Sequence, residues 1–172
     1  MRLFIAINFS DEIISSLIRL REELCSRADK GSYSEPENMH LTLSFLGECS
    51  DKQAETIKAI MDSVTFEPLS ISIDRVGKFG GNANAIWWAG VKESEELLDL
   101  QSRLESELKS AGFSLDDRKY NPHITLGRKI AAELEPWPVE PFGETVYSIE
   151  LMHSKRDNGS LTYEPIHSKQ SS

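Results

Sequence analysis

The sequence reads His40-Leu41-Thr42-Leu43 in one place and His123-Ile124-Thr125-Leu126 in another, and this pair of segments decides the fold. In each segment a histidine and a threonine stand two residues apart, with apolar residues beside them. Successive side chains of a β-strand point to opposite faces, so the histidine and the threonine share one face and the apolar residues share the other. We therefore predict two strands, each with a buried apolar face and a polar face that carries a histidine.

The elements before the two histidine segments also repeat. Apolar periodicity predicts a strand at residues 3–7 and then a helix before His40, and a strand at residues 86–91 and then a helix before His123. In both halves, 37 positions separate the first residue of the opening strand, residue 3 or 86, from the histidine. Chance agreement between two common strand–helix patterns is the alternative to a repeat. Two halves built alike predict a pseudo-twofold structure in which the two polar strands face one cleft.

The rest of the chain predicts a further helix after Ser50 and strands at residues 69–73, 145–152 and 161–163. Residues 78–85 are rich in Gly and Asn and predict a loop. Residues 132–143 combine several prolines with acidic residues, and we expect irregular surface there.

The length and composition are those of one globular domain. Of the 172 residues, 39% are hydrophobic and 27% are charged, and the formal net charge is −9. Proteins that grip nucleic-acid duplexes draw most of their affinity from Lys and Arg, so this charge argues against sequence-independent duplex binding. A small substrate with a phosphate group, held in a locally basic pocket, is compatible with it. We expect one two-lobed domain over residues 1–166 and a disordered tail at residues 167–172.

Targeting signals and cysteine usage point to the cytoplasm. Cys25 and Cys49 are too few for a disulfide framework, and their spacing is not that of a metal site. The apolar run near the N-terminus is interrupted at Asn8, before a signal-peptide core is complete. No stretch approaches the roughly 18 apolar residues of a membrane span. We expect a cytoplasmic monomer that binds no membrane.

A pair of histidines facing one cleft suits general acid–base catalysis. Imidazole has an unperturbed pKa of about 6.5, so near neutral pH one ring can hold a proton while the other accepts one. The hydroxyls of Thr42 and Thr125 share the histidine faces and can donate hydrogen bonds to anionic oxygens. These groups indicate a phosphodiester or cyclic phosphate as the substrate: one histidine activates water, and the other protonates the oxygen that leaves phosphorus.

With these motifs the chain resembles the two-histidine phosphoesterase superfamily, and within it the RNA 2′,3′-cyclic phosphodiesterase family, also called LigT-like or 2′-5′ RNA ligase-like. The resemblance covers nearly the whole chain. Besides the two histidine segments it is carried by Met1-Arg2-Leu3-Phe4-Ile5-Ala6-Ile7, Pro36-Glu37-Asn38-Met39, Phe45-Leu46-Gly47, Trp88-Ala89-Gly90-Val91, Gly112-Phe113, Asn121-Pro122, Gly127-Arg128 and Tyr163-Glu164-Pro165.

The resemblance implies an α+β, bilobal fold in which two antiparallel sheets flank a central cleft, with helices on the outside. It also implies chemistry without a metal or other cofactor, on 2′,3′-cyclic phosphate ends of RNA or on cyclic nucleotides, with a 2′-phosphate as the product. By position, His40 would protonate the leaving 3′ oxygen and His123 would take a proton from water. Thr42, Thr125 and Arg128 would hold the phosphate.

Three features around the motifs leave alternatives open. Simple alternation puts Arg128 on the face opposite His123, so its role requires the strand to end or bulge. Arg118 and Lys119 could line the edge of the cleft, or lie in a solvated loop. Related sequences often have a basic residue and a Trp before the Pro36 segment; here Gly31-Ser32-Tyr33-Ser34-Glu35 stands there, and Tyr33 is an aromatic ring that could stack on a base.

Other residues are expected to be structural. At least one of Trp87 and Trp88 should lie in the core, and His153 and His167 should be surface or structural residues. Metal binding by the paired histidines would need further ligands, and no suitably spaced cluster supplies them. Two other functions stay open: joining of RNA ends through 2′-5′ bonds or cleavage of another phosphodiester in the same cleft, and binding of RNA ends without catalysis.

Overall fold

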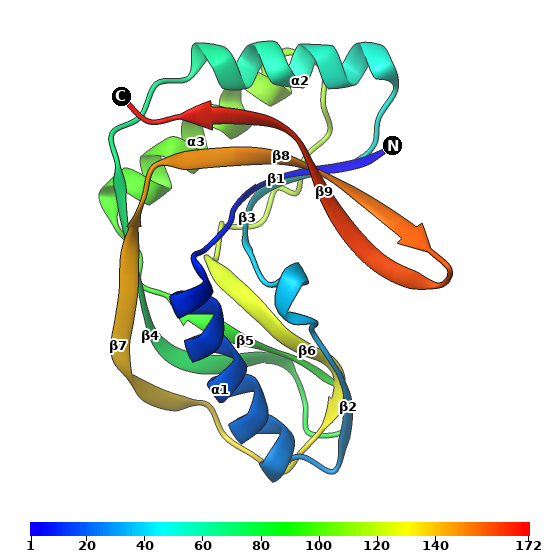
Figure 1. The fold of residues 1–172 in the computed structure, drawn as a ribbon, viewed down its shortest axis with the longest axis vertical. Coiled ribbons are helices and arrows are strands. Elements are labelled where there is room, and N and C mark those ends of the chain that lie inside the picture. The colour runs from blue at the N-terminus through cyan, green and yellow to red at the C-terminus, as the bar shows by residue number, and fades with distance from the viewer.

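The computed structural model describes residues 1–172 and consists of two antiparallel sheets with three α-helices packed against them (Figure 1). The helices are α1 (Asp11–Arg27), α2 (Asp51–Ser63) and α3 (Glu95–Ser110), with a short 3-10 helix, η1, at Pro36–Asn38. The strands are β1 (Arg2–Ile7), β2 (Lys30–Tyr33), β3 (Leu41–Glu48), β4 (Leu69–Gly80), β5 (Ala85–Val91), β6 (His123–Ala131), β7 (Trp137–Val146), β8 (Ser148–Asp157) and β9 (Ser160–Gln170).

The two histidine segments lie in different sheets. A four-stranded sheet has the order β3-β1-β8-β9, and a five-stranded sheet has the order β2-β6-β5-β4-β7. His40 directly precedes β3 in the first sheet, and His123 begins β6 in the second. The predicted α+β class with two antiparallel sheets is confirmed.

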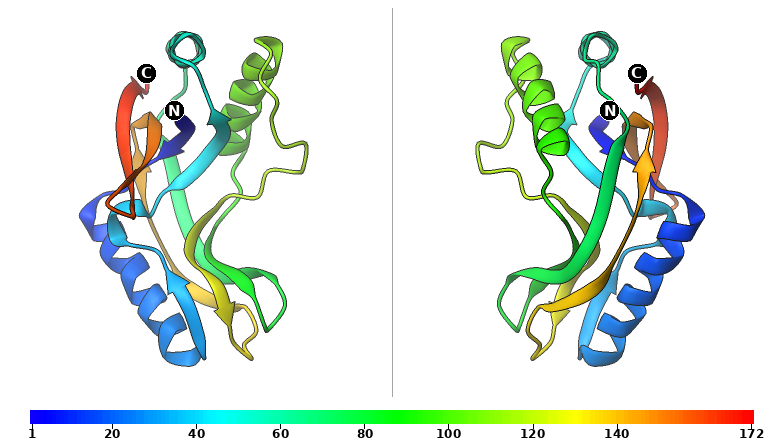
Figure 2. Two further views of the ribbon diagram at one scale, coloured as in Figure 1. Left: turned by 90° about the vertical axis from the view of Figure 1, so that its right-hand side faces the viewer. Right: turned by 90° about the vertical axis from the view of Figure 1, so that its left-hand side faces the viewer.

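The predicted repeat is present, and the two halves exchange helices. Strand β1, helix α1 and strand β3 correspond to β5, α3 and β6. Helix α1 packs against β2, β6 and β7, whereas α3 packs against β3, so each half covers the sheet that holds the other half's histidine strand. Figures 1 and 2 show α1 beside the five-stranded sheet, and α2 and α3 at the opposite end of the molecule. Because of this exchange, one cluster of 35 buried residues forms a common core.

The helices begin where their sequence signals place them. Ser10 accepts a hydrogen bond from the Ile13 amide at the start of α1, and Ser94 does the same for α3. At α2, Ser50 and Gln53 form a complete capping box. Each helix buries the apolar stripe that its periodicity predicts, which anchors the sheets that carry the histidines.

A β-bulge in β6 decides the direction of Arg128. Trp88 of β5 lies opposite Thr125, and Trp87 lies opposite Gly127, so Leu126 is an extra residue in β6. Leu126 and Gly127 are both buried, whereas Arg128 is exposed. The alternation therefore reverses after the bulge, and Arg128 falls on the face of His123 and Thr125. The strand bulges, as the expected role of Arg128 requires.

Strand β3 has a bulge at the corresponding place. Ala6 of β1 lies opposite Thr42, and Ile5 lies opposite Ser44, so Leu43 is the extra residue. By the same reversal, Phe45 falls on the face of Thr42, and 52% of its surface is exposed. Phe45 thus occupies in the first half the position that Arg128 occupies in the second.

Three expectations about irregular segments are wrong. Strand β9 continues to Gln170, so most of the expected tail pairs with β8. Strand β7 runs through Pro138 and Pro141. It is an edge strand of its sheet, and along its outer side the backbone has no partner strand, so a proline without an N–H group is tolerated there. Strand β4 extends to Gly80, which leaves a shorter turn before β5 than the predicted loop at residues 78–85.

Candidate active site

His40 is held by hydrogen bonds at both of its ring nitrogens. Its Nδ1 lies 2.8 Å from the carbonyl oxygen of Asn38, and its Nε2 lies 2.9 Å from Oγ1 of Thr42. A carbonyl oxygen only accepts, so Nδ1 carries the hydrogen and donates it. In the neutral ring Nε2 then accepts the hydroxyl hydrogen of Thr42. Nε2 is therefore the nitrogen whose lone pair can take up a proton.

His123 has the same anchor but a different second contact. Its Nδ1 donates to the carbonyl oxygen of Asn121 over 2.6 Å, whereas its Nε2 has no hydrogen-bond partner in the protein. The free Nε2 lone pair can take a proton from water. Both histidines are thus fixed in one tautomer by the carbonyl of an asparagine two residues earlier. The repeated Asn-x-His pattern was the sequence signal for this anchor.

Aromatic rings surround both imidazoles. Phe4 stacks on His40 with ring centroids 4.8 Å apart, and Tyr163 approaches the same ring edge-on at 5.2 Å. On the other side, Phe79 meets His123 edge-on at 5.2 Å. These three rings come from β1, β9 and β4, and no sequence pattern indicated that any of them lies in the site.

Trp88 is a fourth aromatic neighbour, with its ring centroid 6.0 Å from that of His123. It is buried, as is Trp87, so the expectation that at least one of them lies in the core is confirmed. The Trp88 ring lies against Gly77 of β4, where an added Cβ would come within 2.3 Å of it. Gly77 therefore provides the space that keeps this ring beside His123.

Burial and positive charge lower the pKa of both histidines. Burial lowers the pKa of His40 to about 4, and the charges of His123 and Arg128 add to this effect. Burial also lowers the pKa of His123, again with a contribution from Arg128. The backbone hydrogen bonds from Nδ1 oppose both shifts without cancelling them. His40, His123 and Arg128 therefore lie within electrostatic reach of one another, and both imidazoles are neutral near pH 7.

We call His40, Thr42, His123, Thr125 and Arg128 the histidine site. Thr42 contacts His40 directly, whereas Thr125 shares the strand face of His123 by alternation. A further residue, Tyr120, links the two halves of the site: its hydroxyl donates to the carbonyl oxygen of Thr42 over 2.7 Å. Nothing in the local sequence indicated this contact, because Tyr120 lies in a loop 78 residues away from Thr42.

Other candidates from the sequence lie outside this group. Arg118 is exposed and pairs with Asp116, and Lys119 is exposed beside it. Tyr33 packs against the core, and burial raises its pKa, with a further contribution from Cys25. His167 hydrogen-bonds to Asp62 of α2 over 2.8 Å, which is the structural role expected for it.

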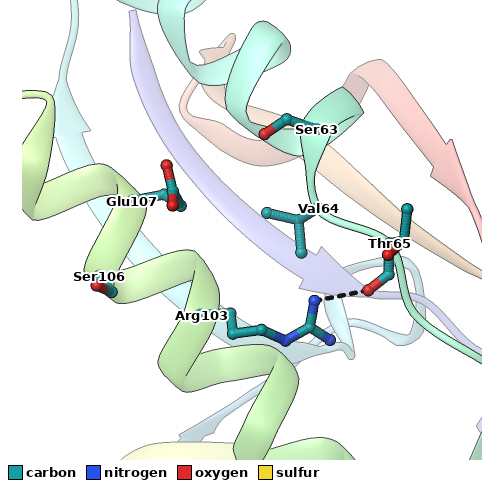
Figure 3. Close-up of a pocket in the computed structure, with 6 residues that line it drawn as sticks. All are labelled: Ser63, Val64, Thr65, Arg103, Ser106 and Glu107. Carbon is teal, nitrogen blue, oxygen red and sulfur yellow. Dashed lines mark hydrogen bonds between the residues drawn. The ribbon is translucent and has the colours of Figure 1, made fainter.

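A polar hollow of about 270 Å³ lies between the end of α2 and α3 (Figure 3). Its lining includes Arg103, which donates a hydrogen bond to the carbonyl oxygen of Thr65 and pairs with Asp99. None of its lining residues belongs to the histidine site.

No group of three or more His, Cys, Asp or Glu side chains is arranged to hold a metal ion. No helix is long and apolar enough to cross a membrane.

Comparison with known proteins identifies the family. Residues 9–157 match the model of the 2′-5′ RNA ligase superfamily. The chain belongs to this superfamily. The predicted resemblance is thereby confirmed, and the matched region contains every residue of the histidine site.

Several known proteins are similar to this chain over most of its length. An RNA 2′,3′-cyclic phosphodiesterase of Archaeoglobus fulgidus is 35% identical over 151 residues, which cover 84% of this chain and 85% of that protein. The protein of the same name from Escherichia coli is 26% identical, over 96% and 93% of the two chains. A crystal structure of E. coli LigT complexed with 3′-AMP superimposes with a TM-score of 0.87 at 25% identity, covering 99% and 97% of the chains.

Proposed function

We propose that this protein is an RNA 2′,3′-cyclic phosphodiesterase that hydrolyses 2′,3′-cyclic phosphate ends of RNA, or cyclic nucleotides, to 2′-phosphomonoesters. The observation that carries the proposal is the pair of histidines with Nδ1 anchored alike and Nε2 as the reactive nitrogen, with Arg128 within reach of both. The names of the similar proteins support the reaction. The complex of E. coli LigT with 3′-AMP supports a nucleotide as the ligand.

In the proposed mechanism His123 is the general base and His40 the general acid. The unpartnered Nε2 of His123 takes a proton from water as the water oxygen bonds to phosphorus. The bond from phosphorus to the 3′ oxygen breaks, and His40 gives that oxygen a proton from Nε2. Because the 2′ oxygen keeps its bond to phosphorus, the product carries a 2′-phosphate.

The phosphate itself completes the protonation state that this mechanism needs. In the free protein both imidazoles are neutral near pH 7, because burial and the charge of Arg128 lower their pKa values. A phosphate anion between them favours the charged form of a histidine, so its binding raises the pKa of His40, which then takes up a proton from solvent. Protonated His40 no longer accepts from Thr42, whose hydroxyl is then free to donate to a phosphate oxygen. Thr125 donates from the other side, and the guanidinium fork of Arg128 stabilises the charge that develops on phosphorus.

The test is turnover of oligonucleotides with 2′,3′-cyclic phosphate ends by the purified protein in the presence of EDTA. Hydrolysis by the wild-type protein, lost in His40→Ala and in His123→Ala, supports the proposal. Absence of turnover, or full turnover in both variants, contradicts it. Identification of the product as a 2′- or 3′-phosphate shows which oxygen leaves.

A second candidate is ligation, which the name of the superfamily favours. A 5′-hydroxyl group of another RNA end can attack the cyclic phosphate in the place of water, with the same two proton transfers, and this forms a 2′-5′ bond. Addition of a 5′-hydroxyl oligonucleotide to the assay separates the two reactions, since ligation gives a longer product. Binding of cyclic ends without any turnover would identify an RNA-end binding module.

A further inference from the structure

The proposed reaction determines on which side the RNA chain lies, and the following inference rests on that proposed function. Water attacks phosphorus opposite the leaving oxygen, so the water lies near His123 and the 3′ oxygen near His40. The 2′ and 3′ oxygens both belong to the terminal ribose. That ribose, and the nucleotides attached to it, must therefore lie on the His40 side, over the four-stranded sheet.

The face of this sheet beyond His40 carries an exposed aromatic ring and an arginine. Arg2 and Phe4 are two residues apart on β1 and so share a face, and Phe4 stacks on His40. Arg2 therefore lies about 7 Å further along the sheet than Phe4. Phe45 of β3, which the bulge turns to this face, lies opposite Phe4. The guanidinium of Arg2 lies over the Phe45 ring, 5.2 Å from its centroid.

A second arginine extends this surface across the sheet. Ser154 of β8 lies opposite Arg2, and Arg156 follows Ser154 by two residues, so Arg156 shares the face of Arg2. Its guanidinium donates a hydrogen bond to the carbonyl oxygen of Gly159 over 3.3 Å. Arg156 is exposed near the end of β8. The strand order β3-β1-β8-β9 thus arranges Phe45, Arg2 and Arg156 in series across the face.

The carboxylate opposite Arg2 does not cancel the positive charge of this face. Glu48 lies opposite Arg2 in the pairing of β1 with β3, and its Oε2 lies 3.3 Å from the N-terminal ammonium group. Glu164 lies opposite His153, and so on the other face of the sheet, where it pairs with Lys155. In a chain with a formal net charge of −9, this face therefore keeps two arginines beside an exposed ring.

We propose that Arg2, Phe45 and Arg156 form a binding subsite for the nucleotide that precedes the cyclic phosphate end of a single RNA strand. Phe45 stacks on the base of that nucleotide, and the two arginines pair with its phosphates. Stacking on a phenyl ring tolerates every base, so the subsite selects RNA ends over free cyclic nucleotides without reading a sequence. The negative net charge of the chain and this locally positive subsite together fit recognition of a strand end.

The test compares two substrates: a trinucleotide with a 2′,3′-cyclic phosphate end and the corresponding mononucleoside 2′,3′-cyclic phosphate. Phe45→Ala should raise KM for the trinucleotide by at least about fivefold, the lower end of what one stacked base contributes. The double variant Arg2→Gln/Arg156→Gln should raise the same KM and make it less dependent on salt. Hydrolysis of the mononucleotide should stay unchanged in all of these variants, which also shows that they fold.

The matched control is Arg19→Gln, which removes one positive charge from α1, where Arg19 contacts Ser16. It should change neither substrate's KM. A KM increase of the same size on both substrates, or no change on the trinucleotide, overturns the subsite while leaving the proposed function intact. If the wild-type protein hydrolyses neither substrate, the proposed function fails, and the subsite fails with it.

Discussion

The hydroxyl of Tyr120 donates a hydrogen bond of 2.7 Å to the carbonyl oxygen of Thr42, and so joins the loop before His123 to the strand that follows His40. Burial raises the pKa of Tyr120, so the hydroxyl stays a neutral donor over the working range of pH. The two histidines belong to different sheets, so this contact links the two parts of the histidine site. This hydrogen bond therefore helps to set the spacing between the two segments that carry His40 and His123.

Tyr120→Phe should lower kcat more than it raises KM. The variant keeps the ring and its packing but loses the hydrogen bond, which costs about 1 kcal/mol in the free energy of unfolding. Looser spacing between the histidines should impair proton transfer more than substrate binding. Steady-state kinetics and denaturant unfolding measure the two effects. A stability loss with unchanged kcat would show that the contact is only structural.

The parts of the fold that local patterns determine could be predicted from the sequence. Alternation placed His40 with Thr42 and His123 with Thr125, because strand geometry has a period of two. The face of Arg128 could not be decided in this way, since the bulge at Leu126 appears only in the pairing with β5. A bulge is defined by the pairing of two strands, so the sequence of one strand does not reveal it.

The surroundings of the histidines were also beyond local patterns. Phe4, Phe79 and Tyr163 reach the imidazoles from three different strands, so only the tertiary fold brings them there. The extent of β9 was missed for a related reason. Its last residues are polar, and they are held by pairing with β8 and by the contact of His167 with Asp62 rather than by an apolar pattern.

Substitution of either histidine should remove most of the activity. His40→Ala and His123→Ala should each lower kcat by about 10²–10⁴-fold, the usual contribution of one general acid or base. The double variant should lose far less than the product of the two effects, because the two proton transfers belong to one step. Single-turnover kinetics on a cyclic-ended oligonucleotide measure all three rates. Multiplicative losses would contradict concerted action of the pair.

The pH profile of kcat/KM should have its optimum below pH 6.5. This parameter reports the free enzyme, which must hold one proton on the pair to react. With the pKa of His40 at about 4 and that of His123 lowered from its usual value, the singly protonated form is most populated at acidic pH. The profile of kcat should lie at higher pH, because bound phosphate raises both pKa values. Coincident profiles for the two parameters would argue against this electrostatic coupling.

Stability should fall as the pH drops from about 6.5 to about 4, and His40 should account for part of the fall. The unfolded chain binds a proton at the ordinary histidine pKa of about 6.5, whereas folded His40 binds one only near 4. The unfolded state therefore takes up more protons in this range, and acid favours unfolding. The full effect of such a shift is about 3 kcal/mol. His40→Gln should flatten the pH dependence of the unfolding free energy relative to the wild-type protein; an equal slope in both would contradict the shift.

Two replacements of Arg128 should separate the effect of its charge from the effect of its planar guanidinium group. Arg128→Lys keeps the positive charge, so the pKa values of His40 and His123 should stay low, but the loss of the planar fork should lower kcat/KM. Burial is the main cause of both lowered pKa values, and Arg128→Gln removes the charge that adds to it, so both imidazoles should titrate at higher pH and the optimum of kcat/KM should move upward. NMR titration of the imidazole resonances measures the shifts without substrate. Unchanged resonances in Arg128→Gln would show that Arg128 does not face the histidines in solution, and the bulge at Leu126 would then not direct it into the site.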